Sequence, residues 1–267
     1  MSEPSIYEVL RDTLRADDPV ALATVTEGPG LGAKILVRPG AAVVGTLGDP
    51  DLDRVVARDS LAELDAGLTS TRHYGAHGEA RAREVTVFVE SFAPAPRLII
   101  FGAVDFTAAL ARAGKLLGFR VTVCDARTVF ATPRRFPMAD EVVNDWPDRH
   151  LATVAGRLGP RDAVCVLTHD AKFDVPAIVA AAATSVGYIG AMGSRRTHAT
   201  RVERLREAGL TDADLARVMA PIGLDIGSRT PEETAVAVCA EIIANRSGVV
   251  VPNLRDGTGP IHRPPAT

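Results

Sequence analysis

The chain has 267 residues, which gives room for one large domain or two domains of ordinary size. Hydrophobic residues make up 46% of it and charged residues 24%, proportions typical of a globular protein with a substantial core. The formal net charge of −3 argues against nucleic acid or an anionic membrane surface as a partner. The first residues show no basic start followed by an apolar run, so we expect no signal peptide and a cytoplasmic protein.

Residues 1–93 are predicted to form a small N-terminal α+β domain. Apolar periodicity and turn residues predict helices at 5–16 and 51–67, and strands at 20–26, 33–38, 41–47 and 84–90. This part carries 9 basic and 15 acidic side chains, a net charge of −6. Because the whole chain has a net charge of −3, the remainder has a net charge of +3. A basic second part suits a small anionic ligand, although a chance distribution of surface charge gives the same balance.

The segment SFAPAPR, residues 91–97, contains two prolines and marks a domain boundary. From 97 to 246 short apolar strands alternate with helices, a rhythm that predicts a Rossmann-like, doubly wound parallel sheet and an α/β fold class. We predict strands at 97–102, 119–125, 141–144, 162–170 and 185–193, and helices at 105–118, 148–158, 174–183, 194–209 and 231–245.

The start of the last helix is well marked, because Thr230 can cap it, Pro231 suits its first position and Glu233 can complete a capping box. The tail, 247–267, is rich in proline and glycine and is expected to add little to the core.

Two features of the second part could suggest a membrane or a metal, and both have simpler interpretations. The stretch 175–193 has no charge, but Pro176 and two glycines favour a buried helix followed by a buried strand over a membrane span. The three cysteines, Cys124, Cys165 and Cys239, show no paired spacing for zinc or for a disulfide framework, so we expect them in the core.

Ligands of a doubly wound sheet bind beyond the carboxyl ends of its strands, where this sequence places unusual residues. The first glycine of a G-x-G-x-x-G/A phosphate loop is present as Gly102, while Val104 and Thr107 fill the other two glycine positions. The branched Val104 occupies the space that a pyrophosphate needs, which disfavours NAD(P) in its usual pose. Asp125, 23 residues after Gly102, lies where an acidic residue would meet a ribose hydroxyl.

Two further strand ends carry polar residues. Thr168, His169 and Asp170 close one strand, and the histidine could serve as an acid, a base, a metal ligand or a structural hydrogen-bonding group. After the next strand, Gly193-Ser194-Arg195-Arg196 opens a helix whose first turn can hold an anion through its N–H groups and guanidinium groups. Cations at a helix start are disfavoured, so a ligand anion or a nearby carboxylate would remove the conflict; alternatively both arginines reach into solvent.

Three segments of this part resemble the C-terminal half of the xanthine dehydrogenase accessory protein family, XdhC/CoxI. They are LTHD at 167–170, YIGAMGSRRTHATRVERLREAGL at 188–210 and PIGLDIGSRTPEETAVAVCAEI at 221–242. The resemblance implies a maturation factor for a molybdenum hydroxylase of the xanthine or carbon monoxide dehydrogenase type. It implies binding of molybdenum cofactor (molybdopterin), sulfuration of the cofactor with a cysteine desulfurase, delivery to the apo-enzyme, and a homodimer.

The chain departs from the family pattern at several positions. Gly102-Ala103-Val104-Asp105 stands where the family has G-A-G-H, and Ala171 replaces the last histidine of T-H-D-H. In the first domain Gly48-Asp49-Pro50 replaces a G-G-C turn, Gly28-Pro29-Gly30-Leu31-Gly32 replaces G-S-x-P-R, and the later C-G-G is missing. The sequence therefore indicates a divergent member that has lost cysteines suited to handling sulfur.

We hypothesise an accessory, chaperone-like protein in which Arg195, Arg196 and the N–H groups after Gly193 hold the phosphate of a pterin cofactor. Thr168, His169 and Asp170 would line the adjacent crevice, and Asp225 would lie in a turn near its rim. Two alternatives stay open: an NAD(P)-dependent oxidoreductase that uses Gly102 and Asp125, and a non-catalytic paralogue that only binds a partner protein.

Overall fold

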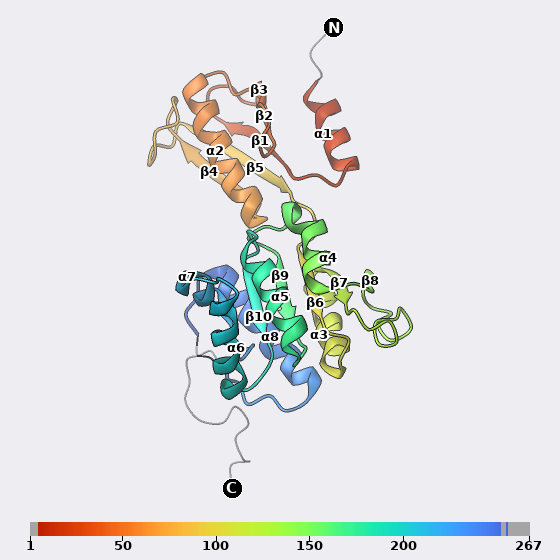
Figure 1. The fold of residues 1–267 in the computed structure, drawn as a ribbon. Helices are drawn as coiled ribbons and strands as arrows, with labels where there is room; N and C mark the ends of the chain where they lie inside the picture. Colours follow the sequence, from red (N-terminus) through yellow and green to blue (C-terminus); the bar gives the residue numbers. More distant parts are fainter. Residues whose placement is uncertain (1–4, 252–254, 256–267) are drawn as a thin grey trace. The chain divides into compact units, whose positions relative to one another are not determined.

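A computed structural model describes residues 5–251 and residue 255. The chain divides into two compact units, Met1–Pro94 and Ala95–Thr267, each with its own sheet and core (Figure 1). The predicted tail, 247–267, falls largely outside the described residues. Among the described helices none is both long enough and apolar enough to cross a membrane.

The first unit is an antiparallel sheet with two helices, α1 (Ile6–Arg15) and α2 (Pro50–Ala66). Its strand order is β3-β2-β1-β5-β4. Its strands are β1 (Val20–Glu27), β2 (Lys34–Val37), β3 (Val44–Thr46), β4 (Ser70–Tyr74) and β5 (Val85–Phe92). The apolar side of α2 packs on this sheet, where Leu52, Val56 and Leu64 are almost fully buried.

The second unit contains a six-stranded sheet with the order β11-β10-β9-β6-β7-β8, in which every pair is parallel. Its strands are β6 (Arg97–Phe101), β7 (Arg120–Cys124), β8 (Glu141–Val143), β9 (Ala163–Val166), β10 (Tyr188–Ala191) and β11 (Val218–Met219). This is the strand order of the dinucleotide-binding fold, with the switch point between β6 and β9. The predicted Rossmann-like α/β fold is therefore confirmed.

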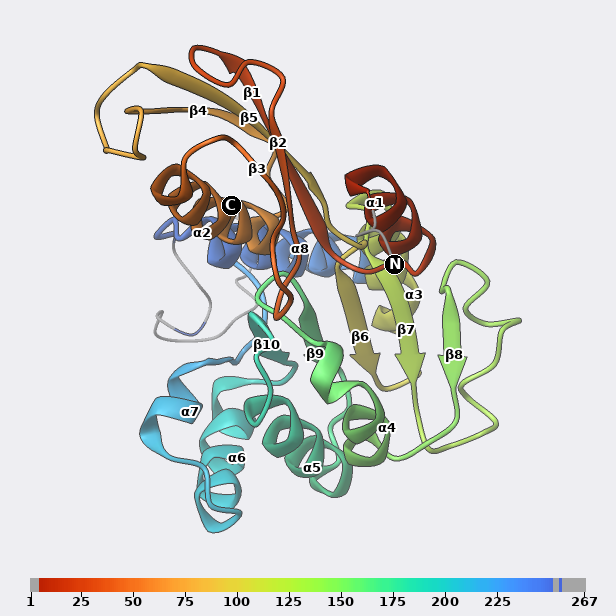
Figure 2. The same cartoon turned by 90° about the horizontal axis from the view of Figure 1, so that it is seen from above.

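Helices cover both faces of this sheet, as Figure 2 shows. One face carries α3 (Asp105–Leu116) and α8 (Pro231–Ser247), and the other carries α4 (Pro147–Val154), α5 (Ala171–Ala182) and α6 (Arg195–Glu207). A short helix, α7 (Asp212–Ala216), precedes β11. The capping box predicted for the last helix is present, with the Glu233 N–H donating to the Thr230 hydroxyl over 3.1 Å.

Several predicted bounds were wrong. The strand predicted at 41–47 is only β3 (Val44–Thr46), and the strand predicted at 185–193 shortens to β10 (Tyr188–Ala191). The helix predicted at 174–183 begins three residues earlier, because the Asp170 carboxylate caps it by accepting the Lys172 N–H. The helix predicted at 148–158 ends at Val154 and continues as a 3-10 turn. The elements β4, α7 and β11 were not predicted at all.

Candidate functional site

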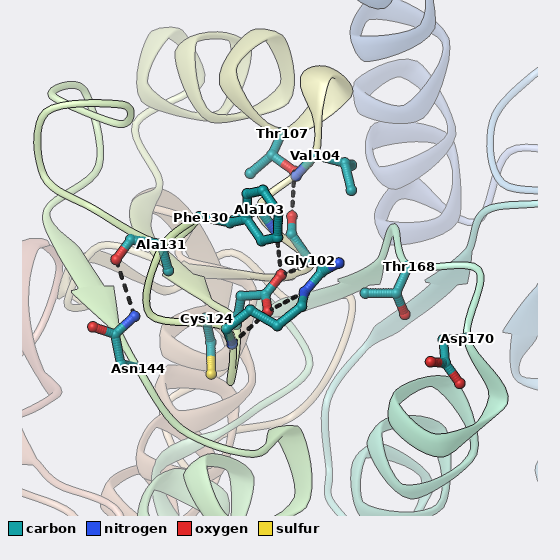
Figure 3. Close-up of polar contacts among 12 residues, drawn as sticks. Gly102, Ala103, Val104, Thr107, Cys124, Phe130, Ala131, Asn144, Thr168 and Asp170 are labelled. Atoms are coloured by element: carbon teal, nitrogen blue, oxygen red, sulfur yellow. Dashed lines mark hydrogen bonds and ion pairs between the residues drawn. The ribbon is translucent and has the colours of Figure 1, made fainter.

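The loop after β6 keeps the turn of a phosphate loop but packs against the neighbouring strand end. Gly102 has φ +106°, and a Cβ there would lie 2.7 Å from Cγ2 of Thr168, so only glycine fits. The Thr107 hydroxyl donates to the Gly102 carbonyl, and Val104 is the N-cap residue of α3 (Figure 3). Thr107 therefore holds the loop closed from within, in the position where a dinucleotide-binding loop has its third glycine.

Asp125, at the end of β7, is committed to contacts within the protein. Its carboxylate accepts the Ala103 N–H over 2.8 Å and pairs with the Arg127 guanidinium at 2.7 Å. Burial of the carboxyl raises its pKa, but the hydrogen bonds from Arg127 and Ala103 outweigh this effect and leave the pKa of Asp125 below its ordinary value. Asp125 thus holds the Gly102 loop at the end of β7, through its hydrogen bond with the Ala103 N–H.

A buried polar network lies at the carboxyl ends of β9 and β10. The Thr168 hydroxyl donates to Asp174, and Arg201 donates to the same carboxylate over 2.8 Å and to the Met192 carbonyl over 2.8 Å. Asp174 and Arg201 are each about 4% exposed. Burial raises the pKa of Asp174, and the contacts with Thr168 and Arg201 offset only part of that rise. The network ties the start of α5 to the middle of α6.

The Gly193 turn opens α6 as predicted, with the Ser194 hydroxyl accepting the Thr197 N–H over 3.1 Å. Gly193 has φ +141°, and a Cβ there would lie 3.6 Å from Nη2 of Arg201. The turn therefore lies next to the buried guanidinium of Arg201.

An apolar cavity of about 350 Å³ lies beyond the carboxyl ends of β6, β9, β10 and β11. Gly193, Ser194 and His169 form part of its wall, to which Ser194 and His169 contribute polar side chains. Its other walls come from the start of α3, the residues around β10 and β11, and α8: Phe106, Met192, Pro221, Ile222, Leu224, Gly227, Ser228 and Thr234. We call it the apolar cavity.

Glu241 of α8 holds one wall of the apolar cavity in place. Its carboxylate accepts the Gly223 N–H over 2.8 Å and the Tyr188 hydroxyl over 2.5 Å. Burial raises the pKa of the Tyr188 phenol well above its ordinary value, so this hydroxyl stays a donor. The segment that carries Ile222 and Leu224 is thereby fixed to the sheet.

A second cavity, of about 400 Å³, lies between α5 and α6. His169, which also lines the apolar cavity, is one of its wall residues. The helices supply the rest: Ala171, Asp174 and Val175 from α5, and Arg196, Thr197, Thr200, Arg201 and Arg204 from α6. We call it the inter-helix cavity.

The structure brings only part of the predicted site together. Gly193, Ser194 and His169 share the apolar cavity, and His169 and Arg196 share the inter-helix cavity. The other predicted residues are not among the described residues that line these two cavities: Gly102, Asp125, Thr168, Asp170, Arg195 and Asp225. For all ten residues, a role in binding a cofactor stays a prediction.

Several residues that line or support these cavities were not predicted from the sequence. Asp174 and Arg201 looked like ordinary helix residues, and Arg127 was overlooked as the partner of Asp125. A usable signal existed in α6, where Arg196, Thr200 and Arg204 recur at intervals of four and must share one face.

The three cysteines are buried, as predicted. Burial raises the pKa of the Cys124 thiol to about 12 and that of Cys239 to about 11. Burial also raises the pKa of Cys165. Thiols in such surroundings stay protonated at neutral pH and are poor nucleophiles.

Comparison with known proteins identifies both units. The model of the XdhC Rossmann domain matches residues 98–242, and that of the XdhC and CoxI family matches residues 13–75. A Bacillus halodurans crystal structure described as a xanthine dehydrogenase shares the fold, with a TM-score of 0.51 over 92% of this chain and 96% of that one at 20% identity.

Three curated relatives are similar in sequence. Uncharacterized protein YqeB of Escherichia coli is 29% identical over 84% of this chain, and a probable xanthine dehydrogenase subunit of Bacillus subtilis is 36% identical over 62%. The molybdenum cofactor insertion chaperone PaoD of Escherichia coli is 31% identical over 37% of this chain.

These alignments span 43%, 47% and 31% of the respective relatives, so this chain matches less than half of each. The match to the Rossmann-domain model alone nevertheless covers more than half of this chain, and the match to the second model lies within the first unit. The chain therefore belongs to the XdhC and CoxI family.

Proposed function

We propose that this protein is a maturation factor for a molybdenum hydroxylase, and that it binds molybdenum cofactor at the carboxyl edge of its Rossmann-like sheet. The observation that carries the proposal is the apolar cavity beside the Gly193 turn, in a domain of the XdhC type. The sequence similarity of this chain to a molybdenum cofactor insertion chaperone and to a probable xanthine dehydrogenase subunit supports the same role.

The residues of this cavity suit a flat ring system that carries a phosphate. Phe106, Ile222 and Leu224 offer apolar surface for the ring, and Ser194 and Ser228 offer hydroxyls at its edge. N–H groups of the first turn of α6, which follows Gly193 and Ser194, would hold the phosphate together with Arg196, a residue of the neighbouring inter-helix cavity. When bound, the cofactor would supply the molybdenum chemistry of the client enzyme, and this chain would orient and shield it.

Sulfuration would then depend on a partner enzyme. The three cysteines are buried and their thiol pKa values are raised, so they are poorly suited to carry a persulfide. We therefore propose that a cysteine desulfurase delivers sulfur to cofactor held by this protein, and that the apo-hydroxylase then accepts the cofactor.

An NAD(P)-dependent oxidoreductase has less support. Both carboxylate oxygens of Asp125 are engaged by Arg127, and one of them also accepts the Ala103 N–H. A ribose would have to displace these contacts. Val104, partly buried against the core, stands where the second glycine of the motif would admit a pyrophosphate.

Titration calorimetry with isolated molybdenum cofactor tests the proposal. We expect saturable binding to the intact protein, and a loss of more than about tenfold in affinity for Leu224→Asp, which places a charge in the apolar cavity. Ile226→Asp is the matched control, because Ile226 is 54% exposed and lies outside the described wall of that cavity. The absence of saturable binding, with unchanged hydroxylase activity in a strain that lacks the gene, would reject the proposal.

A further inference from the structure

The inter-helix cavity gathers positive charge from two helices at once. Ala171 lies in the first turn of α5, and Arg196 and Thr197 lie in the first turn of α6, so both helix starts contribute to its wall. Figures 1 and 2 both show α5 and α6 side by side. The amino ends of helices carry partial positive charge, and residues from two of them line this one cavity. Side chains already cap part of each end, because Asp170 accepts the Lys172 N–H and Ser194 accepts the Thr197 N–H.

Side chains add formal charge to this wall. Arg196, Arg201 and Arg204 line the cavity, and the carboxylate of Asp174 faces them. Asp174 is already paired with Arg201 and also accepts the Thr168 hydroxyl. Arg196 and Arg204 form no ion pair with any described residue, so their two charges are left uncompensated by carboxylates.

A buried donor in the same wall lacks a partner. Nη1 of Arg201 is buried and makes no hydrogen bond with any described residue, although Nη2 of the same guanidinium makes two. The Arg201 side chain is 4% exposed. Leaving such a donor unsatisfied is costly, and buried polar groups without a protein partner point to a ligand or a water.

We propose that the inter-helix cavity is an oxyanion site that binds the phosphoryl or diphosphoryl group of a small molecule. The guanidinium groups of Arg196 and Arg204 and the hydroxyls of Thr197 and Thr200 serve as donors, and Nη1 of Arg201 gains the partner that it lacks. The two uncompensated charges match a dianion. The cavity volume of about 400 Å³ falls within the range of small-molecule sites, so it leaves room for the group that carries the phosphate.

The site itself stands on this cavity, and only the identity of its natural ligand rests on the proposed function. His169 lines both cavities, so they lie next to each other, and a ligand that used both would pass His169 with its phosphate in the inter-helix cavity. Such a ligand would contact Arg196, Arg201 and Arg204 together.

Calorimetry of the full chain with inorganic pyrophosphate, at constant ionic strength set by chloride, tests the site without any cofactor. We expect saturable binding, and a loss of more than about tenfold in affinity for the double variant Arg196→Ala, Arg204→Ala, because each arginine supplies charge-assisted hydrogen bonds. Arg206→Ala is the control, since Arg206 lies on the same helix and pairs with Asp212 away from the cavity wall.

Both variant positions are exposed, so the double variant should keep its fold, which circular dichroism verifies. If that variant lost its fold, Arg204→Glu would test the same charge and should also weaken pyrophosphate binding. Absence of saturable pyrophosphate binding, or equal affinity in the wild type and a folded variant, would overturn the oxyanion site. If molybdenum cofactor still bound in that case, the proposed function would hold and the oxyanion site would be rejected. If pyrophosphate bound but the cofactor did not, the oxyanion site would hold and the proposed function would be rejected.

Discussion

At the scale of single residues, the carboxyl edge of the parallel sheet depends on one buried ion pair. Asp174 and Arg201 are each about 4% exposed, and their contact of 2.8 Å joins α5 to α6. Removing one partner of such a pair leaves a charge with neither water nor a counterion, which costs about 3–5 kcal/mol. An exposed pair contributes under about 1 kcal/mol, because water screens it.

We therefore expect Arg201→Met to lower the free energy of unfolding by about 3–5 kcal/mol in urea denaturation. Arg206→Met, which breaks only the exposed pair with Asp212, should cost under about 1 kcal/mol. Adding Asp174→Asn to Arg201→Met should recover part of the loss, since it removes the stranded carboxylate. Similar losses for the two arginines would contradict a structural role for the buried pair.

Asp125 gives a prediction with a defined pH dependence. Its pKa in the folded protein lies below the ordinary value of 3.8, so its contribution to stability is fully present above that pH and is lost as the pH falls through the folded value. Asp125→Asn should destabilise the protein by about 1–3 kcal/mol near neutral pH, because Arg127 loses its counterion. The stability difference from wild type should shrink below pH 3.8.

Denaturation series from neutral to acidic pH measure this difference. Asp65→Asn is a suitable control, because Asp65 is exposed on α2 in the other unit and should show little difference at any pH. A gap between wild type and Asp125→Asn that widened on acidification would show that the carboxylate is not stabilised by Arg127.

At the scale of elements, the sequence revealed what is encoded locally. The start of α8 was predictable because Thr230, Pro231 and Glu233 are adjacent and act within one turn. The edge strand β4 was not, because Ser70 to Tyr74 is mostly polar and exposed and becomes a strand through its pairing with β5. The early start of α5 was not predicted, because an aspartate that follows a strand can either face a ligand or cap the next helix, and Asp170 caps α5.

In the candidate site too, local features could be predicted from the sequence and contacts between distant residues could not. The Gly193 turn and the Ser194 cap could be predicted, since a strand, a glycine and a serine before a helix are consecutive in the chain. The inter-helix cavity could not, because it requires knowing that α5 packs beside α6 and that Arg201 turns inward to Asp174. Likewise, the pairing of Asp125 with Arg127 decides what the carboxylate can still bind, and residue types alone do not reveal it.

Ser194 lets the capping of α6 be separated from ligand binding. Ser194→Ala removes the acceptor of the Thr197 N–H and should lower the free energy of unfolding by about 1 kcal/mol. Ser194→Asp keeps an acceptor at the cap, so it should retain stability, yet its charge beside the apolar cavity should weaken binding of an anionic ligand. Urea denaturation and titration calorimetry on both variants check this; equal ligand affinity in wild type and Ser194→Asp would place the anion away from this turn.

At the scale of the whole molecule, the two units differ in charge. Residues 1–93 are acidic, and the basic remainder includes the arginines of the inter-helix cavity. Each unit has a core built from its own residues. Because the described walls of both cavities come from the second unit alone, binding there needs no residue of the first unit for direct contact.

Hydrogen exchange on the full chain can locate the effect of ligand. With saturating pyrophosphate, amides in 169–175 and 193–204 should exchange more slowly, because a ligand that contacts α5 and α6 together suppresses their local opening. The double variant Arg196→Ala, Arg204→Ala should show no such slowing at the same concentration. Amides of β1, β2 and β5 should be unaffected, since their hydrogen bonds lie within the first unit. Protection confined to that unit would instead place the anion on its own arginines, away from α5 and α6.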